Sequence, residues 1–198
     1  MHAPRYDHLF VVSDLHLGGK EDFQIFNQGK ALSWLIDNIR DNEKEKRVAL
    51  VLNGDVVDFL AETPARYLDT ADAEAKLNRI INDPAFSDVW KSLAEFVQTP
   101  NRRLVIVMGN HDVELGLPGC RQLLRNYLSG DNEAAAGRLR FAVDGNGHFC
   151  RVGGAEVLCL HGNEFDNWNV VDSFALDKTI RALNRKAVLP EWSPNAGT

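Results

Sequence analysis

The fold is decided by the stretch Leu104-Val105-Ile106-Val107-Met108-Gly109-Asn110-His111-Asp112. An unbroken apolar run ends at a glycine, and amide, imidazole and carboxylate side chains follow at once. Such a run is typical of a strand that is buried on both faces, as in a parallel sheet. Ligands of open α/β sheets bind at the carboxyl ends of the strands. The stretch therefore predicts a parallel sheet with a polar site at that edge.

The same arrangement of an apolar strand followed by polar groups occurs at three other places. These are Asp14 and His16 after Leu9–Val12, Asp55 and Asp58 after Val48–Leu52, and His161 after Ala155–Leu160. Phe23–Arg40, between the first two strands, has its apolar residues at helical spacing. A strand, a helix and a second apolar strand are typical of a parallel unit with a crossover helix. We therefore expect all four polar clusters at one edge of the sheet.

The remaining segments predict helices and a hairpin around that sheet. Residues 59–103 form a helical insertion with helices at Ala71–Ile81 and Phe86–Val97, where Asp83 caps the second helix and Pro84 opens it. Further helices are expected at Pro118–Leu128 and Val170–Lys186. The strands Leu139–Val143 and His148–Val152 flank the turn Asp144–Gly147 and predict a hairpin, and Gly153-Gly154 then turns into Ala155–Leu160.

Composition places the chain among ordinary globular proteins. Its 198 residues are 44% hydrophobic and 25% charged, which predicts one domain over residues 1–198. The net charge of −6 argues against nucleic acid or an anionic membrane as a partner. No apolar stretch approaches the ~20 residues of a membrane span, and the N-terminus lacks a signal-peptide core. Because both features are lacking, we expect a cytoplasmic protein. Three cysteines without CxxC spacing indicate neither disulfides nor a cysteine zinc site.

The donors at the strand ends predict a metal site. Carboxylate, imidazole and amide groups together suit Mn, Fe, Zn or Co better than Ca or Mg, which favour oxygen ligands alone. Asp55 is the natural bridging ligand, because its cluster lies between the others in the chain. Two cations about 3.5–4 Å apart clamp a phosphoryl group and turn water into hydroxide near neutral pH. Two dications outweigh the charges of Asp14 and Asp55, so the site attracts phosphate even on an acidic protein.

The four clusters resemble, in order, the first four motifs of the calcineurin-like metallophosphoesterase superfamily. They are Asp14-Leu15-His16, Gly54-Asp55-Val56-Val57-Asp58, Gly109-Asn110-His111-Asp112 and His161-Gly162. The resemblance implies an α/β fold, a β-sandwich with flanking helices. It implies that Asp14, His16 and Asp55 hold one metal ion and that Asp55, Asn110 and His161 hold the second. A hydroxide that bridges the metals would then attack phosphorus in line. His111 would stabilise the transition state or protonate the leaving group, with Asp58 orienting its ring.

One departure from the family concerns its terminal Gly-His-x-His motif, which no residue after His161 supplies. We expect a domain that is incomplete at its C-terminus and lacks the final strands. Ligands from another chain, or a degenerate site, are the alternatives. The leading hypothesis is hydrolysis of a phosphomonoester, phosphodiester or pyrophosphate with two divalent cations, manganese being favoured. The alternative is a non-catalytic binding or scaffold module of the same fold.

The expected partner is a phosphorylated small molecule or a lipid-like substrate. Phe165-Asp166-Asn167-Trp168-Asn169 resembles the acidic and aromatic continuation of bacterial family members related to lipid A precursor pyrophosphatases. Nucleic acid is disfavoured by the acidic balance of the chain. The sequence predicts neither the oligomeric state nor a role for Asp112.

Overall fold

A four-stranded parallel sheet lies at the centre of the computed structural model, which describes residues 3–20 and 24–185. Its strands, in spatial order, are β2 (His8–Val12), β3 (Val48–Asn53), β4 (Arg102–Val107) and β5 (Leu139–Ala142). Each pairs in parallel with the next. The parallel sheet predicted from the apolar run before Gly109 is therefore confirmed, with β4 between β3 and β5.

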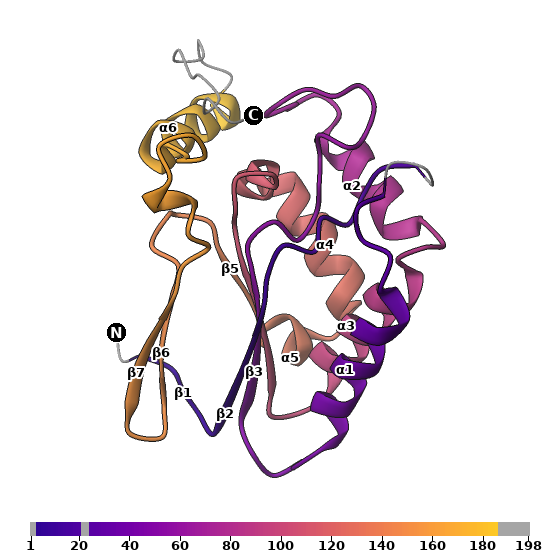
Figure 1. Ribbon diagram of the computed structural model, residues 1–198, viewed down its shortest axis with the longest axis vertical. Coiled ribbons are helices and arrows are strands. Elements are labelled where there is room, and N and C mark those ends of the chain that lie inside the picture. Colours follow the sequence, from indigo (N-terminus) through magenta and orange to yellow (C-terminus); the bar gives the residue numbers. More distant parts are fainter. Residues whose placement is uncertain (1–2, 21–23, 186–198) are drawn as a thin grey trace.

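Helices cover one face of this sheet (Figure 1). They are α1 (Gly29–Asp41), α2 (Ala73–Asn82), α3 (Ser87–Gln98), α4 (Pro118–Ser129) and the short α5 (Glu133–Ala136). Alternate residues of the strands, such as Leu50 and Leu104, pack with the helices in the main hydrophobic core. Trp90 and Phe96 of α3 are buried in the same core. Burying each such side chain contributes about 1.5–3 kcal/mol, so this layer dominates the stability of the fold.

A second sheet faces the other side of the first. It consists of β1 (Arg5–Tyr6), β6 (His148–Val152) and β7 (Ala155–Cys159) in the order β1-β6-β7. β6 runs parallel to β1 and antiparallel to β7. Tyr6 and Cys150 pack on Ala49, and Cys159 packs with residues of β3 and β4. The predicted β-sandwich with flanking helices is therefore present.

The described residues also include two short 3-10 helices and one further α-helix. These are η1 (Val113–Gly116), η2 (Asn163–Phe165) and α6 (Ser173–Asn184). Leu176 of α6 is buried against Met108 and Val113, which follow β4. Of the helices in the described ranges, none has both the length and the apolar character that crossing a membrane requires.

The predicted hairpin between Leu139–Val143 and His148–Val152 is wrong. β5 extends the parallel sheet, where Leu104 donates its amide to the carbonyl of Arg138 at 3.0 Å, and Leu139 is buried in the helix-covered core. β6 lies in the other sheet and forms its hairpin with β7 around the expected Gly153-Gly154 turn. The segment Asp144–Gly147 therefore carries the chain from one sheet to the other.

Helix boundaries also differ from the prediction. α1 begins at Gly29 rather than at Phe23, which lies outside the described residues. Gln24 donates its side-chain amide to the Gly19 carbonyl at 3.0 Å and to Asp83 Oδ2 at 3.1 Å, which holds this segment in an irregular conformation. Asp83 does not cap α3, because its Oδ1 accepts the Ala85 amide in a turn that precedes the helix.

The last predicted helix, Val170–Lys186, begins later than expected. α6 starts at Ser173, where the Asp172 carboxylate caps it by accepting the Ala175 amide at 2.8 Å. Lys186 lies outside the described residues. α2 and α3 both fall within residues 59–103, and β4 begins at Arg102.

Candidate metal centre

The polar residues that follow β2, β3, β4 and β7 come together at one edge of the sandwich. Two groups of donor atoms each lie within 4.8 Å of one another, His16 with Asp58 and His111, and Asp14 with Asp55 and His161. All six belong to the predicted site. Parallel strands place their carboxyl ends at a common edge, so residues distant in sequence meet there.

Asp55 belongs to the second group and also lies close to His16 of the first. Its Oδ2 is 3.7 Å from His16 Nε2 and 3.2 Å from His161 Nε2, and its Oδ1 accepts the main-chain amide of His111 at 2.8 Å. Burial opposes ionisation of this carboxyl group, but the hydrogen bonds from His161 and from the His111 amide hold the pKa of Asp55 below its usual range. Asp55 is therefore an anion with donors of both groups beside it.

Asp58 contacts two histidines rather than one. Its Oδ2 is 3.3 Å from His16 Nδ1, in hydrogen-bond geometry, and 3.4 Å from His111 Nδ1, an ion-pair distance without that geometry. Its Oδ1 accepts the amides of Leu60 and Ala61, both at 3.0 Å. The Asp58 carboxylate raises the pKa of both imidazoles against the effect of burial. The two rings meet edge to face, with their centroids 4.8 Å apart.

Three of the candidate ligands have a left-handed backbone. Asp14, His16 and Asp55 have φ values of 57°, 45° and 51°. This conformation costs an L-residue about 1–2 kcal/mol. Main-chain hydrogen bonds between the two loops maintain it, since His16 donates its amide to the Asp55 carbonyl at 2.9 Å. Strained backbone that its surroundings hold in place is typical of functional sites.

Two glycines make room for the ligands. A Cβ at Gly54, where φ is +87°, would lie 2.3 Å from Cγ and Nδ1 of His161. A Cβ at Gly109 would lie 2.2 Å from Asp55 Oδ1. Both distances are far shorter than a van der Waals contact, so any larger residue at either position displaces a ligand. The glycines of the second and third motifs are thus explained by the close approach of Asp55 and His161.

His161 is oriented by the end of β3. Its Nδ1 lies 2.8 Å from the main-chain carbonyl of Asn53, which accepts the ring proton and leaves Nε2 facing Asp55. A metal-binding histidine is normally held in this way through its second nitrogen. The Asn53 side chain also donates to the Leu160 carbonyl at 2.7 Å. Sequence reasoning missed Asn53, although it directly precedes the second motif.

Asp112, whose role the sequence left open, joins the loops that follow β3 and β4. It is fully buried, and its two oxygens accept the amides of Gly109 at 2.6 Å and Val56 at 2.8 Å. Burial and the negative charge of Asp55 raise the pKa of Asp112 to about 7. Its hydrogen bonds are to the main chain of the two loops that carry Asp55 and Asn110, so Asp112 holds these loops together.

Asn110 is buried in the loop that follows β4, the segment where the sequence predicts a polar site. Its main-chain carbonyl accepts a hydrogen bond from the Tyr67 hydroxyl at 3.2 Å. The segment that contains Tyr67 therefore reaches the site.

These residues fit divalent cations. Carboxylate oxygens of Asp14 and Asp55 lie within 4.8 Å of one another, a distance at which the two anions repel each other, and the imidazoles of His16 and His161 lie beside Asp55. A cation between the groups removes this repulsion, and both nitrogen and oxygen donors are present for it.

Comparison with known proteins agrees with this geometry. The sequence profile of calcineurin-like phosphoesterases matches residues 8–197, a range that includes every candidate ligand. No curated protein and no solved structure matches the chain. The profile and the four strand ends that meet at one edge place the chain in the calcineurin-like phosphoesterase family, whose members hydrolyse phosphoric esters.

Proposed function

We propose that this protein hydrolyses a phosphoric ester with two divalent cations bound at the candidate metal centre. The observation that carries the proposal is the position of Asp55 Oδ2, which has His16 Nε2 at 3.7 Å and His161 Nε2 at 3.2 Å. A carboxylate in this position is suited to be shared by two ions. Asp14, His16 and Asp55 would hold one ion, and Asp55, Asn110 and His161 the other.

The proposed ions are manganese, with iron, zinc or cobalt as substitutes. Imidazole nitrogens in the donor set disfavour calcium and magnesium, and its carboxylate and amide oxygens suit manganese. Divalent cations at this centre supply Lewis acidity and lower the pKa of bound water.

His111 is the proposed general acid. Its Nδ1 faces the Asp58 carboxylate at 3.4 Å, which raises the pKa of the ring and leaves Nε2 as the nitrogen available to substrate. The side chain is about one third exposed, at 32%, so a leaving group can reach it. A protonated His111 donates from Nε2 to the departing oxygen or stabilises the charge on phosphorus-bound oxygens. Asp58 keeps the proton on the ring, and His16 limits how far the ring can tilt.

The proposed substrate is a phosphorylated small molecule or a lipid-like molecule rather than nucleic acid. Apolar side chains are exposed along the segment that follows His161, at 82% for Phe165, 66% for Trp168 and 70% for Phe174. They offer contacts to an apolar portion of a substrate. The net charge of −6 counts against nucleic acid. We place the reaction in the cytoplasm, because all three cysteines are buried and unbridged.

The proposal is tested by the hydrolysis of an aryl phosphate and a bis-aryl phosphate with Mn²⁺, Zn²⁺, Fe²⁺ or Co²⁺ added to the purified protein. We expect turnover together with about two metal equivalents by elemental analysis. His111→Ala is expected to lower the rate about 10²–10⁴-fold with the metal content unchanged. His8→Ala is the matched control, since His8 pairs with Glu43 at the opposite end of β2. Absence of turnover with every metal would overturn the proposal, and absence of bound metal would favour a scaffold.

A further inference from the structure

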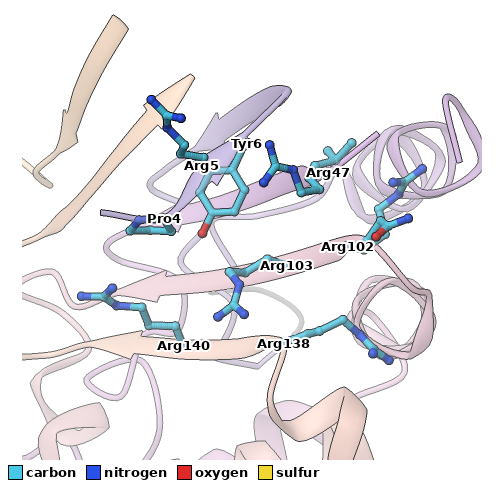
Figure 2. A pocket seen from close by; sticks show the side chains of 10 residues that line it. Pro4, Arg5, Tyr6, Arg47, Arg102, Arg103, Arg138 and Arg140 are labelled. Carbon is cyan, nitrogen blue, oxygen red and sulfur yellow. The ribbon is translucent and has the colours of Figure 1, made fainter. Parts of the chain in front are cut away.

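A second candidate site lies at the amino ends of the strands, opposite the metal centre. It is a cavity of about 490 Å³ in which the starts of β1, β3, β4 and β5 meet (Figure 2). Six arginines line it, and the described residues of its lining include no acidic side chain. They are Arg5, Arg47, Arg102, Arg103, Arg138 and Arg140. On a protein whose net charge is −6, this concentration of positive charge requires an explanation.

Three of these arginines are accounted for by contacts within the fold. Arg102 is fully buried and donates to the carbonyls of Arg40, Lys46 and Asn42. Arg138 donates to two carbonyls at the end of α3. Arg47 is exposed, and its Nε lies 3.7 Å from Asp7 Oδ2. Arg5 also lines the cavity, and Figure 2 shows its guanidinium group extending away from those of Arg103 and Arg140.

Arg103 and Arg140 have no such contacts. Within the described ranges, neither side chain forms a hydrogen bond or an ion pair with an acidic residue. Arg103 is paired with Ala49 and Arg140 with Val105, residues that face the second sheet. The two residues therefore lie on neighbouring strands, on the sheet face that the second sheet covers, and Arg103 is half-buried while Arg140 is exposed.

A buried polar group independently indicates a ligand. Tyr6 is only 6% exposed, and its hydroxyl is buried without a hydrogen-bond partner among the described residues. Figure 2 shows the ring extending from β1 toward the strand that carries Arg103, with the hydroxyl at its leading end. An unsatisfied buried hydroxyl costs about 1–3 kcal/mol, so its persistence beside two free guanidinium groups requires an acceptor.

The buried side chain of His148 indicates the same excess of positive charge. Its ring is buried 6.1 Å from that of Tyr6, centroid to centroid, and both ring nitrogens lack partners among the described residues. Burial and the positive charges of Arg140 and Arg103 lower the pKa of His148 to about 4. The ring therefore stays neutral at neutral pH, so the positive charge beside it comes from the two guanidinium groups.

We propose that the cavity binds a phosphate group through the guanidinium groups of Arg103 and Arg140 and the hydroxyl of Tyr6. Guanidinium groups bind tetrahedral phosphate with paired, charge-assisted hydrogen bonds, and the tyrosine hydroxyl donates a further one. The volume exceeds that of a single phosphate and is within the range of small-molecule sites, so pyrophosphate and small phosphorylated molecules also fit. The site is distinct from the metal centre, because the two lie at opposite ends of β4.

Titration calorimetry of the metal-free protein with pyrophosphate tests the proposal. Without cations the metal centre lacks the positive charge of its metal ions, and the cavity variants assign the heat of binding to the arginine cavity. The double variant Arg103→Gln with Arg140→Gln is expected to weaken binding about 100-fold, or about tenfold for each guanidinium group. Tyr6→Phe, which preserves shape, is expected to weaken it about tenfold. Parallel titrations with inorganic phosphate and glycerol phosphate distinguish free from esterified phosphate as the ligand.

The control removes the same charge elsewhere. Arg181→Gln with Arg185→Gln alters exposed residues at the end of α6 and is expected to leave pyrophosphate affinity unchanged. Circular dichroism checks that each variant is folded. Absence of binding to the unaltered metal-free protein overturns the proposal. It is likewise overturned if the folded cavity variants bind as tightly as the unaltered protein or if the control loses as much affinity as they do. Catalysis plays no part in these measurements, so the proposed hydrolysis stands or fails separately.

Discussion

Replacing Gly54 with alanine tests whether the glycine of the second motif exists to admit His161. The added Cβ would lie 2.3 Å from the imidazole, where ordinary contacts begin at 3.4 Å, so the ring must retreat by about 1 Å. Metal–ligand distances tolerate roughly ±0.2 Å. We expect Gly54→Ala to lose one metal equivalent and at least about 100-fold in kcat/KM, the scale of a 1 Å misplacement in an active site. Elemental analysis and hydrolysis of a bis-aryl phosphate with Mn²⁺ measure the two effects.

Gly153→Ala is the matched control for this prediction. Gly153 also has a positive φ, +58°, but a Cβ there meets nothing within 4 Å. Both substitutions carry the cost of a left-handed alanine, about 1–2 kcal/mol, and only the one at Gly54 displaces a ligand. Full metal content and activity in Gly54→Ala would refute the reasoning. A comparable loss in Gly153→Ala would show that backbone strain, and not the clash, is responsible.

Three further predictions concern stability. Lys76→Met leaves the buried Asp69 carboxylate without the ammonium group 3.4 Å away, and we expect urea unfolding to show a loss of about 3–5 kcal/mol. Asp112→Ala leaves two buried loop amides without acceptors, and thermal unfolding is expected to show a loss of about 3 kcal/mol, with a smaller loss for Asp112→Asn. Burial lowers the pKa of His161, but the hydrogen bond with Asp55 outweighs this effect and raises the pKa to about 9, above its ordinary 6.5. In the metal-free protein, the stabilisation of the fold by protonated His161 is complete below pH 6.5 and is lost as the pH rises through 9. His161→Asn should therefore abolish this part of the pH dependence of stability.

The parallel sheet and the location of the site follow from local sequence patterns. Apolar runs such as Val48–Leu52 are unambiguous because both faces of these strands are buried, and the polar groups after them occupy a common edge for topological reasons. The family profile confirms the resemblance drawn from the four motifs. The roles assigned to individual ligands remain predictions that the proposed experiments test.

The errors arise where pairing depends on tertiary contacts. Leu139–Val143 alternates as a hairpin strand would, but its partner is β4, and only the packing of Leu139 on the helices determines this. Asp83 has the composition of a helix cap and instead stabilises the preceding turn. The arginine cavity is equally invisible in the sequence, because Arg103 and Arg140 belong to different strands and no local pattern joins them to Tyr6.

The order of donors along the chain has a consequence for biosynthesis. Ligands follow β2, β3, β4 and β7, so His161 emerges from the ribosome long after Asp14 and His16. Pairings between such distant segments form late in folding. A nascent chain that stops before the β6–β7 hairpin presents carboxylates and imidazoles without the donor that completes the second group. If the centre binds two cations as proposed, the second group can take up its ion only after synthesis has passed β7.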